Sequence, residues 1–268
     1  MQDVVAYLFS DLITETTAKD DFEAHPFYFH PPVKSPVLQK RASTVPPEGK
    51  SQSIENLPCL RIPMNYIPRT PRGIIFGSDA LCDVVISSNS VSQFHISITF
   101  DAQRRVVVQD LCSSHGTQVT YNDKGNGYRS GFTWVIQPTG YQVIELSNDI
   151  KFRIVLPQHP LSSKEFIEKA DKFREGSDSP ETLMEALQLH TKRTASVAGQ
   201  LSRDPIYLKE QVGQGSYGVV YSLWDVSTGV TYARKEPSPR ALRRGHYEYY
   251  EWEKEVKILK SLDHVSTH

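Results

Sequence analysis

The sequence has few cysteines, little excess charge and no long apolar run. Its three cysteines in 268 residues, an odd number at wide spacing, match neither a disulfide framework nor a zinc-ligand pattern, so we expect a reducing compartment. Thirty Lys and Arg residues against 31 Asp and Glu leave a formal net charge of -1, without the basic track that a nucleic-acid backbone requires. No run approaches the roughly 18 apolar residues of a membrane span, and the N-terminus lacks the basic region of a secretory signal. We therefore expect a cytoplasmic or nuclear protein that binds neither nucleic acid nor membrane.

Residues 14–57 have the composition of a linker. Six prolines lie between residues 26 and 47 among Ser, Thr, Lys and Glu, and no apolar period is sustained. The apolar start at residues 4–13 is long enough for one or two amphipathic helical turns, which alone are unstable in water. The sequence therefore predicts a disordered region over residues 1–57.

Residues 58–160 consist of short β-branched runs separated by turn residues. Apolar and polar residues alternate at 96–100 and again at 152–156, which is the period of a half-buried strand. Many strands without a helical period between them indicate an all-β sandwich. Strands are expected at 73–76, 83–86, 95–100, 105–110, 142–146 and 151–156.

Residues 161–204 have the pattern of a helical connector. Ser162 or Ser163 can cap a segment with apolar residues at i, i+4 and i+7, namely Phe166, Ala170 and Phe173. A second helix is expected to begin at residues 179–181 and to end near residues 192–193. From residue 205 a glycine-containing β pattern leads into a charged periodic segment that predicts a helix at 247–262.

Four segments of the predicted sandwich resemble the motifs of the forkhead-associated (FHA) family in order, spacing and strand context. The resemblance spans residues 60–157 and implies an FHA-like sandwich whose end loops bind a phosphothreonine-containing protein. A phosphothreonine carries nearly two charges and needs several donors held on rigid loops. The four segments are Phe76-Gly77-Ser78, Cys82-Asp83-Val84, Val91 to His95 and Asp110 to Thr117.

Two residues of the phosphopeptide site that the resemblance implies match the family pattern. Ser92 matches the phosphate-binding Ser of the family, and His95 matches the His that braces this loop from inside. The alternative for both residues is a purely internal hydrogen-bonding role. The implied phosphopeptide-binding residues are Ser78, Ser92, Gln93, His115 and Thr120.

Four of these positions depart from the family pattern. Ser78 stands where the family has its phosphate-binding Arg, and Gln93 stands where a basic residue is usual. His115 and Thr120 replace two Asn residues, and an exposed turn residue is the alternative reading of His115. Because a neutral Ser cannot form the bidentate charge-assisted contact of an Arg, reduced phosphate affinity is expected.

A second resemblance, to the protein kinase N-lobe, covers residues 206–264. Residues 213–219 read G-x-G-x-x-G followed by Val, and Lys235 follows at the distance of the third strand of the lobe. Residues 255–264 resemble the end of the kinase C-helix. An ordinary glycine-rich hairpin is the alternative for the first of these motifs.

The kinase resemblance implies an ATP site. Glycines allow the loop to close over the phosphates, and Val220 is expected to pack on the base. Lys235 is expected to pair with the α- and β-phosphates and Glu255 to orient Lys235, although most acids of that charged helix are solvated. The implied nucleotide-binding residues are Val212, Gly213, Gln214, Gly215, Ser216, Tyr217, Gly218, Val219, Val220, Lys235 and Glu255.

The catalytic loop and the D-F-G motif of a kinase occur nowhere in the sequence. We therefore predict no catalytic residue and no metal ligand, weak ATP binding and no phosphoryl transfer. FHA followed by kinase resembles the checkpoint kinases of the DNA-damage response, especially fungal ones, so the sequence is interpreted as an N-terminal fragment of such a serine/threonine kinase. The alternatives are a non-catalytic interaction module and a truncated product without function. The expected order is a disordered region (1–57), an FHA-like sandwich (58–160), a helical connector (161–204) and a truncated α+β kinase N-lobe (205–268).

Overall fold

The structure, a computed structural model, describes residues 3–31, 57–177, 183, 185–188, 204–215, 218–237, 253–254 and 257. The chain divides into two compact units, Met1–Asp204 and Pro205–His268. Within the described ranges, no helix has both the length and the apolar character needed to cross a bilayer.

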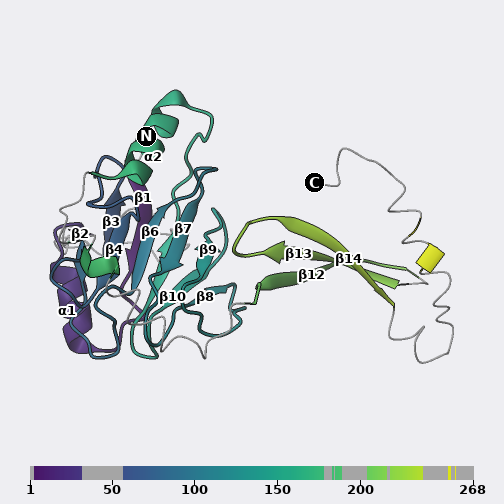
Figure 1. Ribbon diagram of the computed structural model, residues 1–268, viewed down its shortest axis with the longest axis horizontal. Coiled ribbons are helices and arrows are strands. Elements are labelled where there is room, and N and C mark those ends of the chain that lie inside the picture. Colours follow the sequence, from purple (N-terminus) through teal and green to yellow (C-terminus); the bar gives the residue numbers. More distant parts are fainter. Residues whose placement is uncertain are drawn as a thin grey trace, which may run out of the picture. The chain divides into compact units, whose positions relative to one another are not determined.

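The first unit is a sandwich of two β-sheets (Figure 1), as the sequence predicts. All described strand pairs in it are antiparallel except the parallel pair formed by the first two strands of the smaller sheet. In spatial order the larger sheet consists of β2 (Tyr28–Phe29), β3 (Cys59–Pro63), β1 (Val4–Phe9), β11 (Lys151–Val155), β10 (Gln142–Glu145) and β8 (Gln118–Tyr121). The smaller sheet consists of β5 (Val84–Val85), β4 (Ile74–Gly77), β6 (Ile96–Phe100), β7 (Val106–Asp110) and β9 (Thr133–Val135).

The core lies between the two sheets and is built from alternate residues of the strands. Phe76 of β4 stacks on Phe152 of β11 with ring centroids 6.0 Å apart, and Trp134 of β9 is fully buried. Phe76 lies opposite Ile96 of β6 in the strand register, so both side chains face the other sheet. The alternation predicted at 96–100 and 152–156 is therefore the pattern of strands that line a core.

The N-terminal residues belong to the sandwich, which corrects the prediction of a disordered region and of a short helix at residues 4–13. Strand β1 pairs with β3 on one side and with β11 on the other, and Ala6 and Leu8 are fully buried. A strand covered on both faces has a continuous apolar run, which periodicity cannot distinguish from a short helix. The predicted disorder at 32–56 falls outside the described residues.

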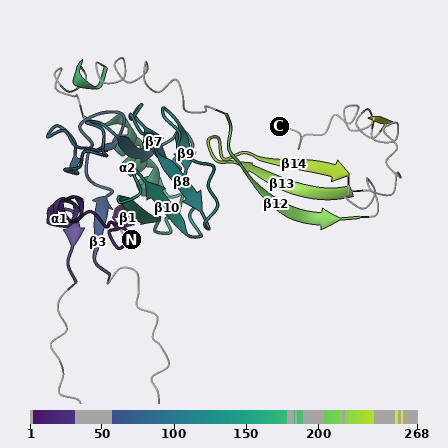
Figure 2. The same cartoon turned by 90° about the horizontal axis from the view of Figure 1, so that it is seen from below.

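Helix α1 (Thr16–Ala24) closes one edge of the sandwich, where disorder was also predicted. It contacts β2 and β3 of one sheet and β5 of the other (Figures 1 and 2). Its Phe22 enters the core and stacks on Phe152 with ring centroids 5.7 Å apart. The sequence pattern of this helix is weak, because Ala18 and Phe22 are its buried residues and the others are polar apart from Ala24, which is exposed.

Acidification should weaken the attachment of this N-terminal segment through His25. His25 Nδ1 accepts a hydrogen bond from the Phe27 backbone N–H (3.1 Å), and Nε2 donates to the Asp83 carbonyl (2.9 Å), so the ring is neutral. Burial lowers the pKa of His25. A histidine whose pKa is lower in the folded chain contributes stability that is complete above about pH 6.5 and is lost as the pH falls through the folded value.

We expect the melting temperature of the wild type to fall from about pH 7 to about pH 5.5 by more than that of His25→Gln, measured by circular dichroism. Gln retains a donor for the Asp83 carbonyl but does not titrate. Burial raises the pKa of the Asp83 carboxyl, an effect of opposite sign that both proteins share. Equal falls in the two proteins would contradict the assignment to His25.

Helix α2 (Lys164–Glu175) packs on the sandwich and begins at the predicted cap. Ser163 Oγ accepts a hydrogen bond from the Phe166 backbone N–H at 3.2 Å. Phe166 and Phe173 meet Phe100 of β6 edge-on, with ring centroids 6.0 and 5.6 Å apart. The first half of the predicted connector is thus part of the first unit. Of the second predicted helix, residues 183 and 185–188 are described, and they are helical.

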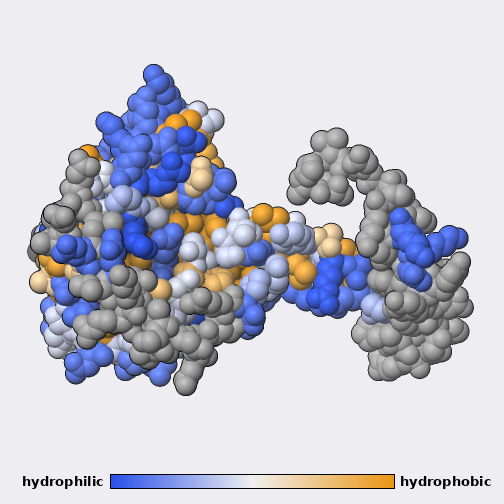
Figure 3. All heavy atoms as spheres, in the orientation of Figure 1, coloured by the Kyte–Doolittle hydropathy of each residue, from blue (hydrophilic) through white to orange (hydrophobic). Residues whose placement is uncertain are grey.

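The second unit contains an antiparallel sheet in the order β12 (Tyr207–Gln214), β13 (Gly218–Asp225) and β14 (Thr231–Pro237). Apolar residues are exposed on this sheet (Figure 3), among them Val212, which is 62% exposed. Of the predicted C-helix, residues 253, 254 and 257 are described as helical, and the rest falls outside the described residues.

Candidate functional site

Three loops meet at one end of the sandwich. Phe76 near the end of β4 lies opposite Ile96 at the start of β6, which lies opposite Asp110 at the end of β7. The loops that extend these strand ends are residues 78–83, residues 86–95 (the Ser92 loop) and residues 111–117 (the Ser114 loop). The Ser78 backbone N–H donates to the Ser92 carbonyl at 3.1 Å, so the first two loops are in direct contact.

His95 joins the Ser92 loop to the Ser114 loop. It is fully buried, its Nδ1 accepts a hydrogen bond from the Ser92 backbone N–H (3.1 Å), and its Nε2 lies 3.2 Å from the Gly116 carbonyl. One ring nitrogen accepts and the other donates, so the ring is the neutral tautomer protonated at Nε2. His95 braces the loop from inside, as the family resemblance implies.

The carboxylate of Asp110 fixes the shape of the Ser114 loop. Its Oδ1 accepts from the backbone N–H groups of Ser113 (2.9 Å) and Gly131 (2.8 Å). Its Oδ2 accepts from the hydroxyls of Ser113 (2.6 Å) and Thr117 (2.7 Å). No separate role was predicted for Asp110, although an Asp at the end of a buried strand with a Ser three residues later is a recognisable side-chain turn.

Two hydroxyls and an imidazole form the rim where the loops meet. Ser92 Oγ lies 3.0 Å from Ser114 Oγ and also accepts the Ser114 backbone N–H at 3.0 Å. Ser114 Oγ lies 3.3 Å from His115 Nδ1, and both of these residues are exposed. Ser114 is not among the residues predicted from the sequence, where its position next to His115 was the available signal.

The remaining predicted site residues lie in different surroundings. Ser78 is next to the Ser92 loop, but its hydroxyl donates to the Val91 carbonyl at 3.1 Å. Gln93 lies in the Ser92 loop and is exposed. Thr120 lies inside β8 opposite Val143, so among the described contacts the structure does not bring it to the rim.

The N-terminal segment of the chain contacts the beginning of the Ser92 loop, at Ser87 and Ser88. Glu15 Oε2 accepts a hydrogen bond from the Ser88 hydroxyl at 2.7 Å. Asp21 Oδ2 of α1 accepts the Ser87 backbone N–H at 2.8 Å. Both carboxylates lie far from this loop in sequence, so no local pattern predicts these contacts. The loop that carries Ser92 is therefore positioned by residues that precede the whole motif region.

In the second unit, the strand register places Val220 and Lys235 on one face of the sheet. The two residues lie directly opposite each other on β13 and β14. Arg234 points to the other face, where its Nε lies 3.0 Å from Glu236 Oε1. Lys209 Nζ also contacts this carboxylate at 2.8 Å, and it lowers the pKa of Glu236.

The three glycines of the G-x-G-x-x-G motif differ in what the fold requires. A Cβ at Gly213 or Gly215 would meet no atom within 4 Å, whereas a Cβ at Gly218 would lie 2.7 Å from the Glu236 carbonyl oxygen. Of these three glycines, the described structure requires only Gly218. Ser216, Tyr217 and Glu255 fall outside the described residues, so the pairing of Lys235 with Glu255 stays a prediction.

Among solved structures, a crystal structure of Rad53 1-466 in complex with AMP-PNP is 19% identical and covers 72% of this chain, with a TM-score of 0.37. The present chain spans 42% of that chain. Mycobacterium tuberculosis EmbR in complex with a low affinity phosphopeptide is 22% identical, with a TM-score of 0.25 over 33% of this chain and 21% of its own. The FHA domain of CT664 protein from Chlamydia trachomatis is 24% identical, with a TM-score of 0.25 over 33% of this chain and 81% of its own.

No curated protein matches the sequence. The family model of the FHA domain matches residues 74–130, which run from the start of β4 through both rim loops and β8 into the connection before β9. The matched residues lie in the sandwich and include Ser92, His95, Asp110 and Ser114. The chain therefore contains an FHA domain.

Proposed function

We propose that the first unit recognises a phosphothreonine-containing segment of a partner protein at the rim formed by Ser92, Ser114 and His115. The observation that carries the proposal is the hydrogen bond between Ser92 Oγ and Ser114 Oγ, which holds two hydroxyls from different loops at one point. A phosphate accepts several hydrogen bonds, and hydroxyls, backbone N–H groups and a protonated imidazole donate them. The FHA match supports this assignment.

The proposed site should bind phosphate weakly. Its first loop provides Ser78 in place of a cation, and the Ser78 hydroxyl is already bonded to the Val91 carbonyl. Neutral donors give hydrogen bonds about half as strong as charge-assisted ones. The partner therefore has to contribute contacts beyond the phosphate, or bind transiently.

Introducing an arginine at position 78 should strengthen binding. Ser78→Arg is expected to gain about 1 to 3 kcal/mol for a phosphothreonine peptide, because a guanidinium donates charge-assisted hydrogen bonds to phosphate. Fluorescence anisotropy with phosphorylated and unphosphorylated forms of one peptide measures the gain. Ser87→Arg, at an exposed position of the Ser92 loop, controls for the added charge. A wild type that binds both peptide forms equally would contradict phosphate recognition.

We also propose that the second unit binds the phosphates of ATP on the face that carries Val220 and Lys235. The observation that favours it is the open space at Gly213 and Gly215, where the described fold does not require glycine. A glycine at such positions lets the backbone approach a ligand closely. This second proposal covers nucleotide binding and not phosphoryl transfer.

Two neighbouring cations on β14 provide a matched test of the nucleotide proposal. Lys235→Met should weaken binding of a fluorescent ATP analogue by about tenfold or more, the size of a lost charged hydrogen bond. Arg234→Met removes the same charge from the opposite face and should leave the affinity within about twofold. Equal losses in both variants would indicate nonspecific attraction of the anion.

A further inference from the structure

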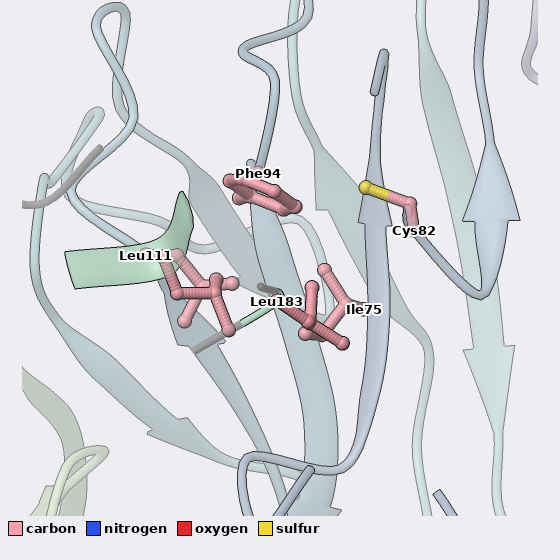
Figure 4. Packing of buried hydrophobic residues seen from close by; sticks show 6 residues of the cluster. Ile75, Cys82, Phe94, Leu111 and Leu183 are labelled. Carbon is pink, nitrogen blue, oxygen red and sulfur yellow. The ribbon is translucent and has the colours of Figure 1, made fainter. Parts of the chain in front are cut away.

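The outer face of the smaller sheet carries an apolar patch that another part of the chain covers. Ile75 points away from the core, because its neighbours Ile74 and Phe76 point into it. Leu183 and Leu187 pack with this patch in one cluster (Figure 4), and they are 2% and 4% exposed. The outer patch consists of Ile75, Cys82, Phe94 and Leu111.

The covering segment, of which residues 183 and 185–188 are described, is helical there and has the pattern of a docked amphipathic helix. Leu183 and Leu187 are four residues apart, so they lie on the same helical face. Glu185 and Gln188 are exposed on the remaining surface. The apolar side of this segment thus packs on the outer patch, and its polar side faces water.

The outer patch is continuous with both loops of the rim. Phe94 lies in the Ser92 loop immediately before His95, and Leu111 is the first residue of the Ser114 loop. The Leu111 backbone N–H donates to the His95 carbonyl at 2.9 Å, and Cys82 Sγ donates to the Gln93 carbonyl at 3.1 Å. Packing of Leu183 and Leu187 therefore restrains the two loops from the side opposite to the core.

The outer face of this sheet also carries a hydroxyl whose burial is unfavourable. Ser97 lies opposite Ile75 in the register of β4 and β6, so its side chain shares the outer face. Ser97 is fully buried, and its hydroxyl has no hydrogen-bond partner among the described residues. A buried hydroxyl without a partner is unfavourable, and the cost disappears when water reaches it.

We propose that the outer patch is the docking surface for segment 183–188, and that docking holds the Ser92 and Ser114 loops in the geometry that receives a peptide. The second half rests on the proposed function of the rim. Because coupling between two sites is reciprocal, a peptide bound at the rim strengthens the docking of the segment that leads in sequence to the second unit.

The test compares the full chain with two variants of the segment. Leu183→Asp combined with Leu187→Asp releases the segment, and Gln188→Asp places a charge on its exposed side as the matched control. Hydrogen exchange without any peptide should show amides of the Ser92 and Ser114 loops exchanging about tenfold faster in the double variant and unchanged in the control. Affinity for a phosphothreonine peptide should fall by about tenfold in the double variant alone.

The outcomes separate this inference from the proposed function. Unchanged loop exchange in a folded double variant overturns the docking inference. If the loop amides exchange faster in the double variant but the wild type binds no phosphopeptide, the docking inference holds and the proposed function of the rim is wrong. If the double variant loses its core protection as well, Leu183→Ala provides the milder perturbation, and equal exchange in its loops and in the wild type then overturns the inference.

Discussion

Deleting residues 1–13 should abolish folding of the sandwich, although the FHA match begins only at residue 74. Strand β1 lies between β3 and β11, so its loss leaves two unpaired strand edges in the middle of the larger sheet. It also uncovers the core at Ala6 and Leu8, which are fully buried. Calorimetry of the deletion variant should show no cooperative transition, whereas a retained transition would mean that β1 is dispensable.

A pair of leucine substitutions measures the same contribution without a deletion. Leu8→Ala should lower the free energy of unfolding by about 2 to 5 kcal/mol, the usual cost of a buried leucine truncated in a core. Leu161 is 67% exposed, and Leu161→Ala should change the free energy by no more than about 0.5 kcal/mol. Urea denaturation followed by tryptophan fluorescence gives both values. Similar values for the two variants would place β1 outside the cooperative unit.

The sequence predicted the sandwich and the loops that carry Ser92 and His95, but not the N-terminal elements that complete the fold. Ser92, His95 and the loop around His115 could be located because short motifs encode local turns at fixed offsets. The contact of Glu15 with Ser88 spans 73 residues and the pairing of β1 with β11 spans the whole domain, and no local period records such pairings. The predicted boundary at residue 58 therefore excluded three elements that close the sandwich.

The same distinction holds in the second unit. Alternation along one strand predicts that the neighbours Arg234 and Lys235 face opposite ways, and the register of β13 and β14 agrees. The meeting of Lys235 with Glu255 depends on how a helix packs across the sheet, which spacing alone does not determine. Close packing requires a glycine at Gly218 but not at Gly213 or Gly215. The sequence motif alone does not predict this difference.

Asp110→Ala should remove both stability and peptide binding. The buried carboxylate accepts four hydrogen bonds, and truncation leaves donors of Ser113, Thr117 and Gly131 without a partner. We expect a loss of about 3 to 5 kcal/mol in the free energy of unfolding, measured by urea denaturation, because each buried donor left unpaired is costly. Asp20→Ala, at an exposed position of α1, is the control.

The comparison with Ser92→Ala then separates scaffold from contact. Ser92→Ala removes one hydroxyl from the rim and should lower peptide affinity by about tenfold while the free energy of unfolding changes by about 1 kcal/mol. Asp110→Ala should abolish binding, since the Ser114 loop loses the bonds that fix its shape. Full peptide affinity in a folded Asp110→Ala protein would mean that this loop does not form the site, and the proposed rim would have to be abandoned.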